Sequence, residues 1–422
     1  MRVEVLNTGS ELLLGAAVNT HLAFLGQQLF TIGLRVERQT CVPDGPVIGT
    51  AMRESFARCE VLIVTGGLGP TSDDITRELV AGYFGLAMER DEAIYEYIKD
   101  RVAKFGRTIN DNLARQALVP QGMIVLPNHH GTAPGLYLPA RTHEEEATPH
   151  IFLLPGPPRE LRPMVTGDLI PRLRELRAAR GGVAQAMRVF RIVGLGESQV
   201  EEMVGPQLTA LPGLELGYCA RYGEVDVRLI GSDETVARAT EIVRAEPGLR
   251  EHLISESNET LEEIIVHLLR ERNATLVTAE SCTGGLLAHR ITNVPGASKV
   301  FIAGPVTYTN AAKVRGLGVE PALIDAHTAV SEEVARAMAL GVQKTFGADY
   351  AIATTGVAGP DGATADAPVG TVFLAVAEPN GEVEVKRRQF FVSDRETFKF
   401  LASQTAFYLL RRKLLAQAAH AD

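Results

Sequence analysis

The chain has 422 residues, more than one hydrophobic core usually supports, so we expect two or three domains. Hydrophobic residues make up 45% of the sequence and charged residues 22%, a globular balance that excludes a long disordered tract. The 42 basic residues against 51 acidic ones give a net charge of −9, and with no long basic run this balance argues against nucleic acid as a partner.

The cysteine spacing and the first residues indicate a cytoplasmic protein. The four cysteines form no CxxC pair, which predicts reduced thiols and neither a disulfide nor a zinc site. The opening MRVEVLNTGSELLLG lacks the charged and apolar regions of a signal peptide, and no apolar run reaches the roughly 18 residues of a membrane span. We therefore expect a cytoplasmic location and no membrane association.

Residues 1–170 alternate between strand and helix patterns and form the first predicted domain. The β-branched run at 61–65 leads into a glycine-rich turn, and the apolar residues of 18–32 fall on one helical face. Alternation of this kind predicts an α/β fold with a parallel sheet covered by helices. The predicted strands are 2–8, 34–42, 61–65, 123–126 and 151–154, and the predicted helices are 18–32, 44–59, 91–118 and 159–164.

The turn after the third of these strands is a candidate phosphate site. Its glycines and the N–H groups that open the next helix can surround a phosphate. Asp73 and Asp74, with Glu11 after the first strand, are candidate ligands of a hard divalent cation. The alternative is that Ser72 or Asp73 simply caps the helix. The candidate anion-binding residues are Gly66, Gly67, Gly69 and Thr71.

Residues 171–255 are predicted to form a small α+β module. A charged helix at 171–180 comes first, followed by a strand at 187–193 and a helix that opens at Glu197. A second strand at 224–231 and a helix at 233–245 complete the predicted module.

Residues 256–422 form the third predicted domain and contain the best-marked site. A helix at 256–272 and a buried strand at 275–279 lead to Ser281, on a turn before another helix. Free N–H groups at the start of that helix can hold a developing oxyanion, and Gly284 and Gly285 allow a close approach to the backbone. The turn alone fits a phosphate cradle or a plain helix cap equally well.

The segment around 308–313 supplies a candidate base for this serine. Lys313, if desolvated beside Ser281, can lose its charge at neutral pH and take the hydroxyl proton, with Tyr308 relaying the proton or orienting the lysine. The alternative is a solvated surface lysine and a core tyrosine.

Two later segments suit an anionic ligand. The glycine-rich loop 354–362 follows a strand at 350–353 and precedes another at 369–377; it fits ligand binding or a long turn. Ser393 and Glu396 form a predicted capping box, which puts Arg395 in the first helical turn. A cation is disfavoured at that end of a helix, so an anionic partner explains the position.

These residues resemble the CinA carboxy-terminal domain, the nicotinamide mononucleotide deamidase family, through AESCTGG, VTYTNAAK, GVAGPDG and PVGTV, with SDR near the end. The resemblance implies hydrolysis of nicotinamide mononucleotide to nicotinate mononucleotide and ammonia without a cofactor, with Ser281 as nucleophile, Lys313 as base and Tyr308 assisting. Ala311 stands where family members commonly have an acidic residue, and Ala363 stands where they commonly have a glycine. The resemblance implies that these two differences affect the affinity for substrate rather than the chemical step. The resemblance also implies substrate contacts from Thr283, Gly284, Gly285, Thr355, Gly356 and Arg395.

The other regions also resemble parts of CinA proteins. Residues 1–170 resemble the amino-terminal domain, a relative of molybdopterin-binding folds that in some members is an ADP-ribose pyrophosphatase requiring a divalent metal ion, Mg, Mn or Co. Residues 171–255 resemble the KH-like linker domain, which we interpret as a spacer or as the dimerisation element of a homodimer. His129 and His130 depart from the family pattern, and as adjacent loop histidines they are expected to be solvated.

The sequence leaves three functions in competition. They are a two-site hydrolase of pyridine-nucleotide salvage, a non-catalytic adaptor in DNA uptake or repair, and a molybdopterin-handling protein. The acidic net charge argues against direct DNA binding, and the presence of Ser281, Tyr308 and Lys313 argues for catalysis. The expected partners are small nucleotides.

Overall fold

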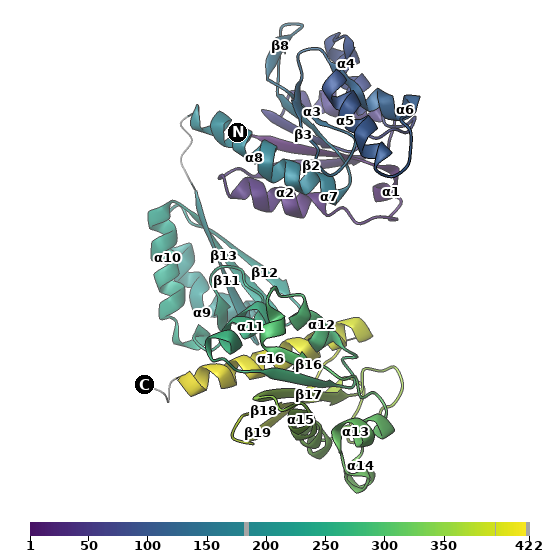
Figure 1. The fold of residues 1–422 in the computed structure, drawn as a ribbon. Helices are drawn as coiled ribbons and strands as arrows, with labels where there is room; N and C mark the ends of the chain where they lie inside the picture. Colours follow the sequence, from purple (N-terminus) through teal and green to yellow (C-terminus); the bar gives the residue numbers. More distant parts are fainter. Residues whose placement is uncertain (181–184, 393, 419–422) are drawn as a thin grey trace. The chain divides into compact units, whose positions relative to one another are not determined.

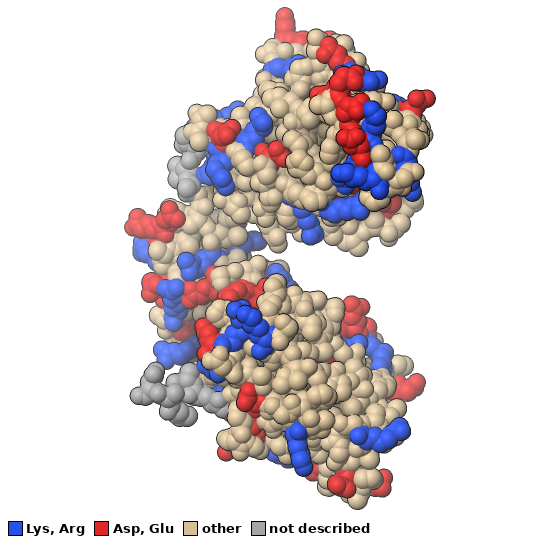
Figure 2. Space-filling view, in the orientation of Figure 1, with Lys and Arg blue, Asp and Glu red and all other residues tan. Residues whose placement is uncertain are grey.

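The computed structural model describes residues 1–180, 185–392 and 394–418. The chain divides into two compact units, Met1–Ala184 and Gln185–Asp422, which are described separately (Figure 1). Within the described residues, no helix is long and apolar enough to cross a membrane. On the face shown in Figure 2, basic and acidic side chains of the described residues are interspersed.

The first unit contains the predicted sheet, with helices against it. Strand order is β2-β1-β3-β10-β7-β6; the first four strands run parallel, β7 is antiparallel to β10, and β6 is antiparallel to β7. Every residue of β1 and β3 is buried, the pattern of strands covered on both faces. The strands are β1 (Val3–Thr8), β2 (Val36–Val42), β3 (Val61–Thr65), β6 (Ile124–Leu126), β7 (Gly135–Leu138) and β10 (His150–Leu154).

Two apolar cores hold the helices of this unit to the sheet. One contains Leu29 and Leu173, and the other contains Ile48 and Val80. The α-helices are α1 (Ser10–Leu13), α2 (His21–Phe30), α3 (Val47–Phe56), α4 (Thr76–Phe84), α5 (Glu92–Ala103), α6 (Asp111–Ala114), α7 (Pro158–Met164) and α8 (Ile170–Ala178). Shorter elements are η1 (Arg115–Ala117), η2 (Val165–Leu169), β4 (Met88–Arg90), β5 (Leu118–Pro120), β8 (Arg141–His143) and β9 (Glu146–Thr148).

Two predicted helices of this region differ from the structure. The predicted helix 91–118 is divided into α5, α6 and η1, because the chain leaves α5 through a left-handed turn at Gly106, whose φ is 68°. The charged helix assigned to the middle module is α8, and its Leu173 is fully buried in the core of the first unit. The few apolar residues of a mostly charged helix therefore decide where it packs.

The second unit opens with a four-stranded antiparallel sheet of order β12-β13-β11-β14. Phe190 and Val227 are fully buried in its core, beneath two helices. The predicted α+β module is confirmed, although β12 and β14 were not predicted. The elements are β11 (Ala186–Val193), α9 (Glu197–Thr209), β12 (Glu215–Arg221), β13 (Glu224–Gly231), α10 (Asp233–Ala245), η3 (Pro247–Leu249) and β14 (Leu253–Ser255).

The rest of the second unit is a mixed sheet of order β16-β15-β17-β18-β19, in which the first three strands are parallel. Phe398 belongs to the core on one face and Met338 to the core on the other. The strands are β15 (Leu276–Glu280), β16 (Phe301–Ala303), β17 (Tyr350–Gly356), β18 (Thr371–Ala377) and β19 (Val383–Gln389). The helices are α11 (Leu261–Glu271), α12 (Leu286–Thr292), η4 (Ala297–Lys299), α13 (Asn310–Leu317), α14 (Pro321–His327), α15 (Glu332–Phe346) and α16 (Arg395–Ala418).

The topology of this sheet places the predicted site residues at one edge. β15 and β17 are parallel neighbours, with Glu280 opposite Thr354. Ser281 directly follows β15, while Thr355 and Gly356 end β17, so they meet where ligands of parallel sheets bind.

Candidate active site

Ser281 and Lys313 meet at this edge although 31 residues separate them in the chain. The Lys313 ammonium nitrogen, Nζ, lies 3.1 Å from Ser281 Oγ and 3.1 Å from the Thr307 carbonyl oxygen. Lys313 is only 2% exposed, and Ser281 8%. Thr309 caps the helix that carries the lysine by accepting a hydrogen bond from Ala312 N at 3.2 Å, which fixes the start of α13.

Burial changes the acid–base chemistry of this lysine. Loss of solvent lowers the pKa of Lys313, because a buried ammonium is not stabilised by water. The neighbouring Cys282 opposes this shift, but the effect of desolvation on the pKa of Lys313 is the larger one. A lysine of lowered pKa in contact with a serine hydroxyl is suited to accept its proton.

The N–H groups that open α12 are not free, which corrects the expectation of an oxyanion site there. The fully buried Glu280 accepts hydrogen bonds from Gly285 N at 2.9 Å, Leu287 N at 3.1 Å and Ala288 N at 2.8 Å. Ser281 N donates to the Thr354 carbonyl at 3.0 Å. The carboxylate therefore anchors the serine turn and occupies the positive end of the helix.

The residues of the glycine turn after Ser281 make contacts within the protein that stabilise the turn. Gly284 and Gly285 have φ of 60° and 94°, values that favour glycine. The fully buried Thr283 pairs its hydroxyl with that of Thr354 at 2.7 Å. None of these three predicted substrate-binding residues lines the cleft described next.

A cleft of about 220 Å³ lies over Ser281 and Lys313. Thr355, Gly356, Tyr308 and Arg395, which the sequence singled out, line it, and the hydroxyl of Thr355 donates to the Ala329 carbonyl at 2.6 Å. Sequence reasoning did not single out three other polar residues here. Asn310 and Asp361 line the cleft and Glu280 supports its floor, and each lies within a motif that the sequence already marked.

Tyr308 and Arg395 form one side of the cleft. The Tyr308 hydroxyl accepts a hydrogen bond from Arg395 Nη2 at 3.0 Å, and Arg395 Nη1 donates to the Gly359 carbonyl. Tyr308 is 57% exposed, so it is not a core tyrosine. Ser393 of the predicted capping box lies outside the described residues; Asp394 caps α16 by accepting from Thr397 N at 2.7 Å.

The first unit has a second polar hollow, of about 370 Å³, at the carboxyl ends of β1, β3 and β10. Gly66 and Gly67 lie at φ of 101° and 67°, and a Cβ at Gly67 would come 2.0 Å from Thr76 Oγ1. Asp74 accepts from Thr71 N at 2.9 Å and from the Thr71 hydroxyl. All of the predicted residues of this region line the hollow, namely Glu11, Gly66, Gly67, Gly69, Thr71, Asp73 and Asp74.

The helix that follows the glycine turn carries a buried arginine with few partners. Arg77 is fully buried on α4, and among the described residues no hydrogen-bond acceptor reaches any of its three guanidinium nitrogens. A Glu78 oxygen lies 3.9 Å from Nη2, and burial lowers the pKa of Arg77. Gln116, which lines the hollow, also keeps a buried Oε1 without a partner in the described chain. Buried polar groups of this kind are costly unless a ligand satisfies them.

The chain matches known proteins over nearly its whole length. Residues 258–414 match the CinA C-terminal domain, residues 4–175 the Probable molybdopterin binding domain, and residues 187–257 the Damage-inducible protein CinA KH domain. A CinA-like protein of Akkermansia muciniphila is 46% identical over 406 residues, covering 96% of each chain. Another, of Geotalea uraniireducens, is 37% identical over 422 residues, covering 99% of this chain and 98% of the relative. The crystal structure of the competence/damage inducible protein CihA from Agrobacterium tumefaciens is 38% identical, with a TM-score of 0.35, covering 36% of this chain and 92% of that chain.

Proposed function

The chain belongs to the CinA family, and from this premise we propose that Ser281 and Lys313 hydrolyse the carboxamide of nicotinamide mononucleotide. The observation that carries the proposal is the 3.1 Å contact between Ser281 Oγ and a lysine that is 2% exposed. A pyridinium ring withdraws electrons from its carboxamide and so favours attack on the carbonyl carbon. The products are nicotinate mononucleotide and ammonia.

Two proton transfers by Lys313 complete the proposed reaction. Neutral Nζ takes the Ser281 proton as Oγ attacks the carboxamide carbon. The C–N bond then breaks, and Nζ returns the proton to the leaving nitrogen, so ammonia departs and an ester remains on Ser281. Water, deprotonated by the same Nζ, attacks this ester; the Oγ–C bond breaks and Oγ regains a proton from Nζ.

Tyr308 and Arg395 are proposed to position the substrate. Arg395 has five N–H donors, and the bonds to Gly359 and Tyr308 engage two of them. The donors left at the cleft wall suit the phosphate of a mononucleotide. This contact would hold the carboxamide over Ser281 by anchoring the far end of the ligand.

The direct experiment is incubation of the purified full chain with nicotinamide mononucleotide. Ammonia and nicotinate mononucleotide should form in equal amounts without an added cofactor. A non-catalytic adaptor would release neither, so absence of both products from folded protein would overturn the proposal.

Substitution of Arg395 by alanine should raise KM for nicotinamide mononucleotide roughly 10- to 100-fold, because the loss of a charge-assisted hydrogen bond weakens binding by about that factor. The same substitution should change kcat less. Arg315→Ala is the control, because Arg315 is an exposed α13 side chain that does not line the cleft. Steady-state kinetics of ammonia release measure both constants. A large fall in kcat at unchanged KM would assign Arg395 to the chemical step instead.

A second activity is proposed for the first unit, hydrolysis of the pyrophosphate of ADP-ribose. The support is the glycine turn at 66–69 and the carboxylates of Glu11 and Asp73 around one hollow, with the buried guanidinium of Arg77 on the helix that follows this turn. The glycine backbone and the buried cation suit a doubly charged diphosphate.

A divalent metal ion, Mg, Mn or Co, is proposed to accompany that substrate. Among the described residues, no three His, Cys, Asp or Glu side chains are gathered as a metal cage, and Asp74 is already bonded to Thr71. Mg²⁺ commonly uses one or two carboxylates together with substrate phosphate oxygens, so Glu11 and Asp73 would hold it. When bound, the ion would offset the charge of the pyrophosphate.

The double variant Asp73→Asn, Asp74→Asn should lose metal-dependent ADP-ribose hydrolysis and retain deamidation. Asp73→Asn alone should reproduce the loss, because Asp74 serves the turn, and Asp100→Asn on α5 is the exposed control. Chelator treatment of the unmodified protein should have the same selective effect. Loss of deamidation in the folded double variant would show that the two sites are coupled.

A further inference from the structure

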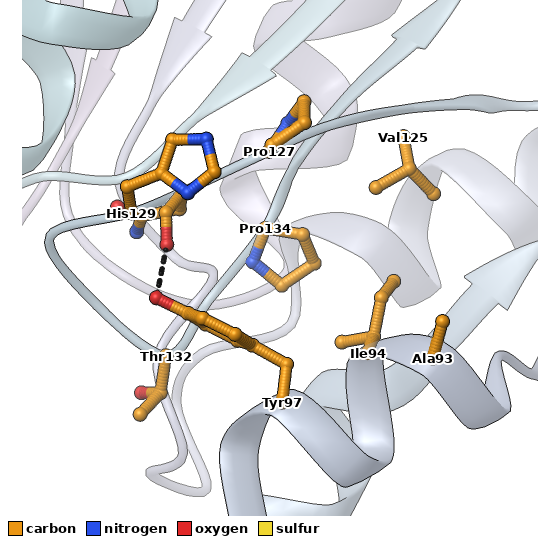
Figure 3. A pocket seen from close by; sticks show the side chains of 9 residues that line it. Ala93, Ile94, Tyr97, Val125, Pro127, His129, Thr132 and Pro134 are labelled. Atoms are coloured by element: carbon orange, nitrogen blue, oxygen red, sulfur yellow. Dashed lines mark hydrogen bonds between the residues drawn. The ribbon is translucent and has the colours of Figure 1, made fainter. Parts of the chain in front are cut away.

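Side-chain hydrogen bonds tie helices to neighbouring segments in both units. In the first unit, the Tyr97 hydroxyl of α5 donates to the Asn128 carbonyl at 2.9 Å, beside an apolar hollow of about 210 Å³ (Figure 3). In the second unit, contacts of this kind join the middle module, which comprises β11 to β14 with α9 and α10, to the long helix α16. The first turn of α16 carries the cleft residue Arg395.

One face of α16 holds the middle module at three places. Gln404, Tyr408 and Arg411 follow one another at spacings of four and three residues, so they lie on the same face of the helix. The Gln404 amide donates to the Glu224 carboxylate. The Tyr408 ring stacks on His252 with 6.1 Å between ring centroids, and the guanidinium of Arg411 donates to two backbone carbonyls of the module. The module is therefore fixed along the helix rather than at one point.

The same glutamine contacts a buried arginine on α12, the helix that follows the serine turn. Arg290 is 7% exposed, and it donates to Gln404 Oε1 at 2.6 Å and to Ser403 Oγ at 2.8 Å. Its Nη2 also donates to Glu262 Oε2 at 2.7 Å. Two phenylalanine rings of α16 have centroids 5.0 and 4.8 Å from its guanidinium carbon. Arg290 therefore fixes α12 against α16.

The orientation of the Gln404 amide links these two sets of contacts. Its oxygen accepts from Arg290, and its nitrogen donates to Glu224 of the middle module. The turn before Glu224 packs closely on the helix, since a Cβ at Gly223 would lie 3.4 Å from Gln404 Cγ. Gln404 is only 1% exposed, and a buried amide that loses its partner is costly. Loss of the Glu224 acceptor should therefore displace α16 or the module.

The helix carries the position of Gln404 to the cleft. Arg395 lies nine positions before Gln404, roughly 14 Å along an α-helix that rises about 1.5 Å per residue. Arg395 lines the cleft and donates to the Tyr308 hydroxyl at 3.0 Å. Ser281 follows β15, which is held by its own pairing with β17. A displacement of α16 therefore moves Arg395 relative to Ser281.

We propose that the middle module is a positioning element of the cleft, in which Glu224, through Gln404 and α16, holds Arg395 where it binds the substrate phosphate. The inference rests on the proposed function of Arg395 and gives the module a role beyond that of a spacer. Glu224 touches no substrate, so it is a positioning residue. Its contribution belongs to substrate affinity and not to the chemical step.

The test is calorimetric titration of the full Ser281→Ala chain with nicotinamide mononucleotide, because this background binds the ligand without consuming it. Two substitutions form a matched pair. Both remove the negative charge that lies 3.6 Å from Arg191, but Glu224→Gln keeps an oxygen that accepts from Gln404 and Glu224→Met does not. Glu224→Met should weaken binding roughly five- to tenfold, because one buried hydrogen bond is lost. Glu224→Gln should bind as the parent chain does.

A double-mutant cycle separates positioning from a general loosening of the fold. In a chain that also carries Arg395→Ala, Glu224→Met should cause no further loss of affinity, because the group that it positions is already gone. Two results would overturn the proposal. One is Glu224→Met protein that binds as tightly as Glu224→Gln protein, and the other is an equal loss of affinity with and without Arg395.

Ammonia release is measured separately, on chains that keep Ser281. Binding that depends on Glu224 through Arg395, without any ammonia release, would refute the proposed deamidation and leave the positioning role intact. Absence of any binding of nicotinamide mononucleotide to the folded chain would overturn both.

Discussion

Replacing Ser281 with alanine should lower kcat for deamidation by a factor on the order of 10⁴ or more, because removal of a nucleophile abolishes the covalent route. The change removes one oxygen atom from a small side chain, and Lys313 keeps its contact with the Thr307 carbonyl. Thermal unfolding should therefore change little. Ammonia release at saturating nicotinamide mononucleotide measures the effect, with unfolding followed in parallel.

The neighbouring Cys282 provides a matched control for this variant. It also lines the cleft, but burial raises the pKa of its thiol to about 12, so it is not a thiolate at neutral pH. Cys282→Ala should keep most of the deamidase activity. If Ser281→Ala turned over normally, or if folded Cys282→Ala were the inactive variant, the nucleophile would have to be reassigned.

Lys313→Arg should also be nearly inactive, although it keeps a positive charge. A guanidinium does not release its proton near neutral pH and cannot serve as the base. Circular dichroism should accompany the kinetics, because the larger side chain enters a buried position. Lys344→Arg, at an exposed position of α15, is the control and should behave as the unmodified chain.

The pH dependence of kcat/KM gives an independent test of the lysine. Because burial lowers the pKa of Lys313, its active neutral form is populated at lower pH than for a lysine in water, whose pKa is 10.5. The rate should rise with pH as Lys313 loses its proton, and this limb should be missing in Lys313→Arg. An arginine variant with normal rates and the same profile would make Lys313 a binding residue.

The fold was predictable where a local pattern carried the information. Buried apolar runs such as 61–65 and 350–353 predicted strands of parallel sheets, and these strands are present. Predictions failed where the pattern was weak. The half-exposed β12 has no strong alternation, and the pattern over 91–118 did not show the break at Gly106. Pairing with a neighbouring strand stabilises β12, and pairing is a property of the folded chain.

The sequence by itself determined which residues are candidates for the chemistry, because a serine after a buried strand, a lysine on the next motif and a glycine-rich loop are local signals. Only the tertiary structure decided what each of them contacts. The parallel pairing of β15 and β17 and the burial of α13 bring Lys313 to Ser281 and lower its pKa. The same packing turns Glu280 inward, where it takes the helix N–H groups that the sequence had left for an oxyanion. Desolvation and hydrogen-bond competition depend on every neighbour in space, and so they are fixed only when the chain has folded.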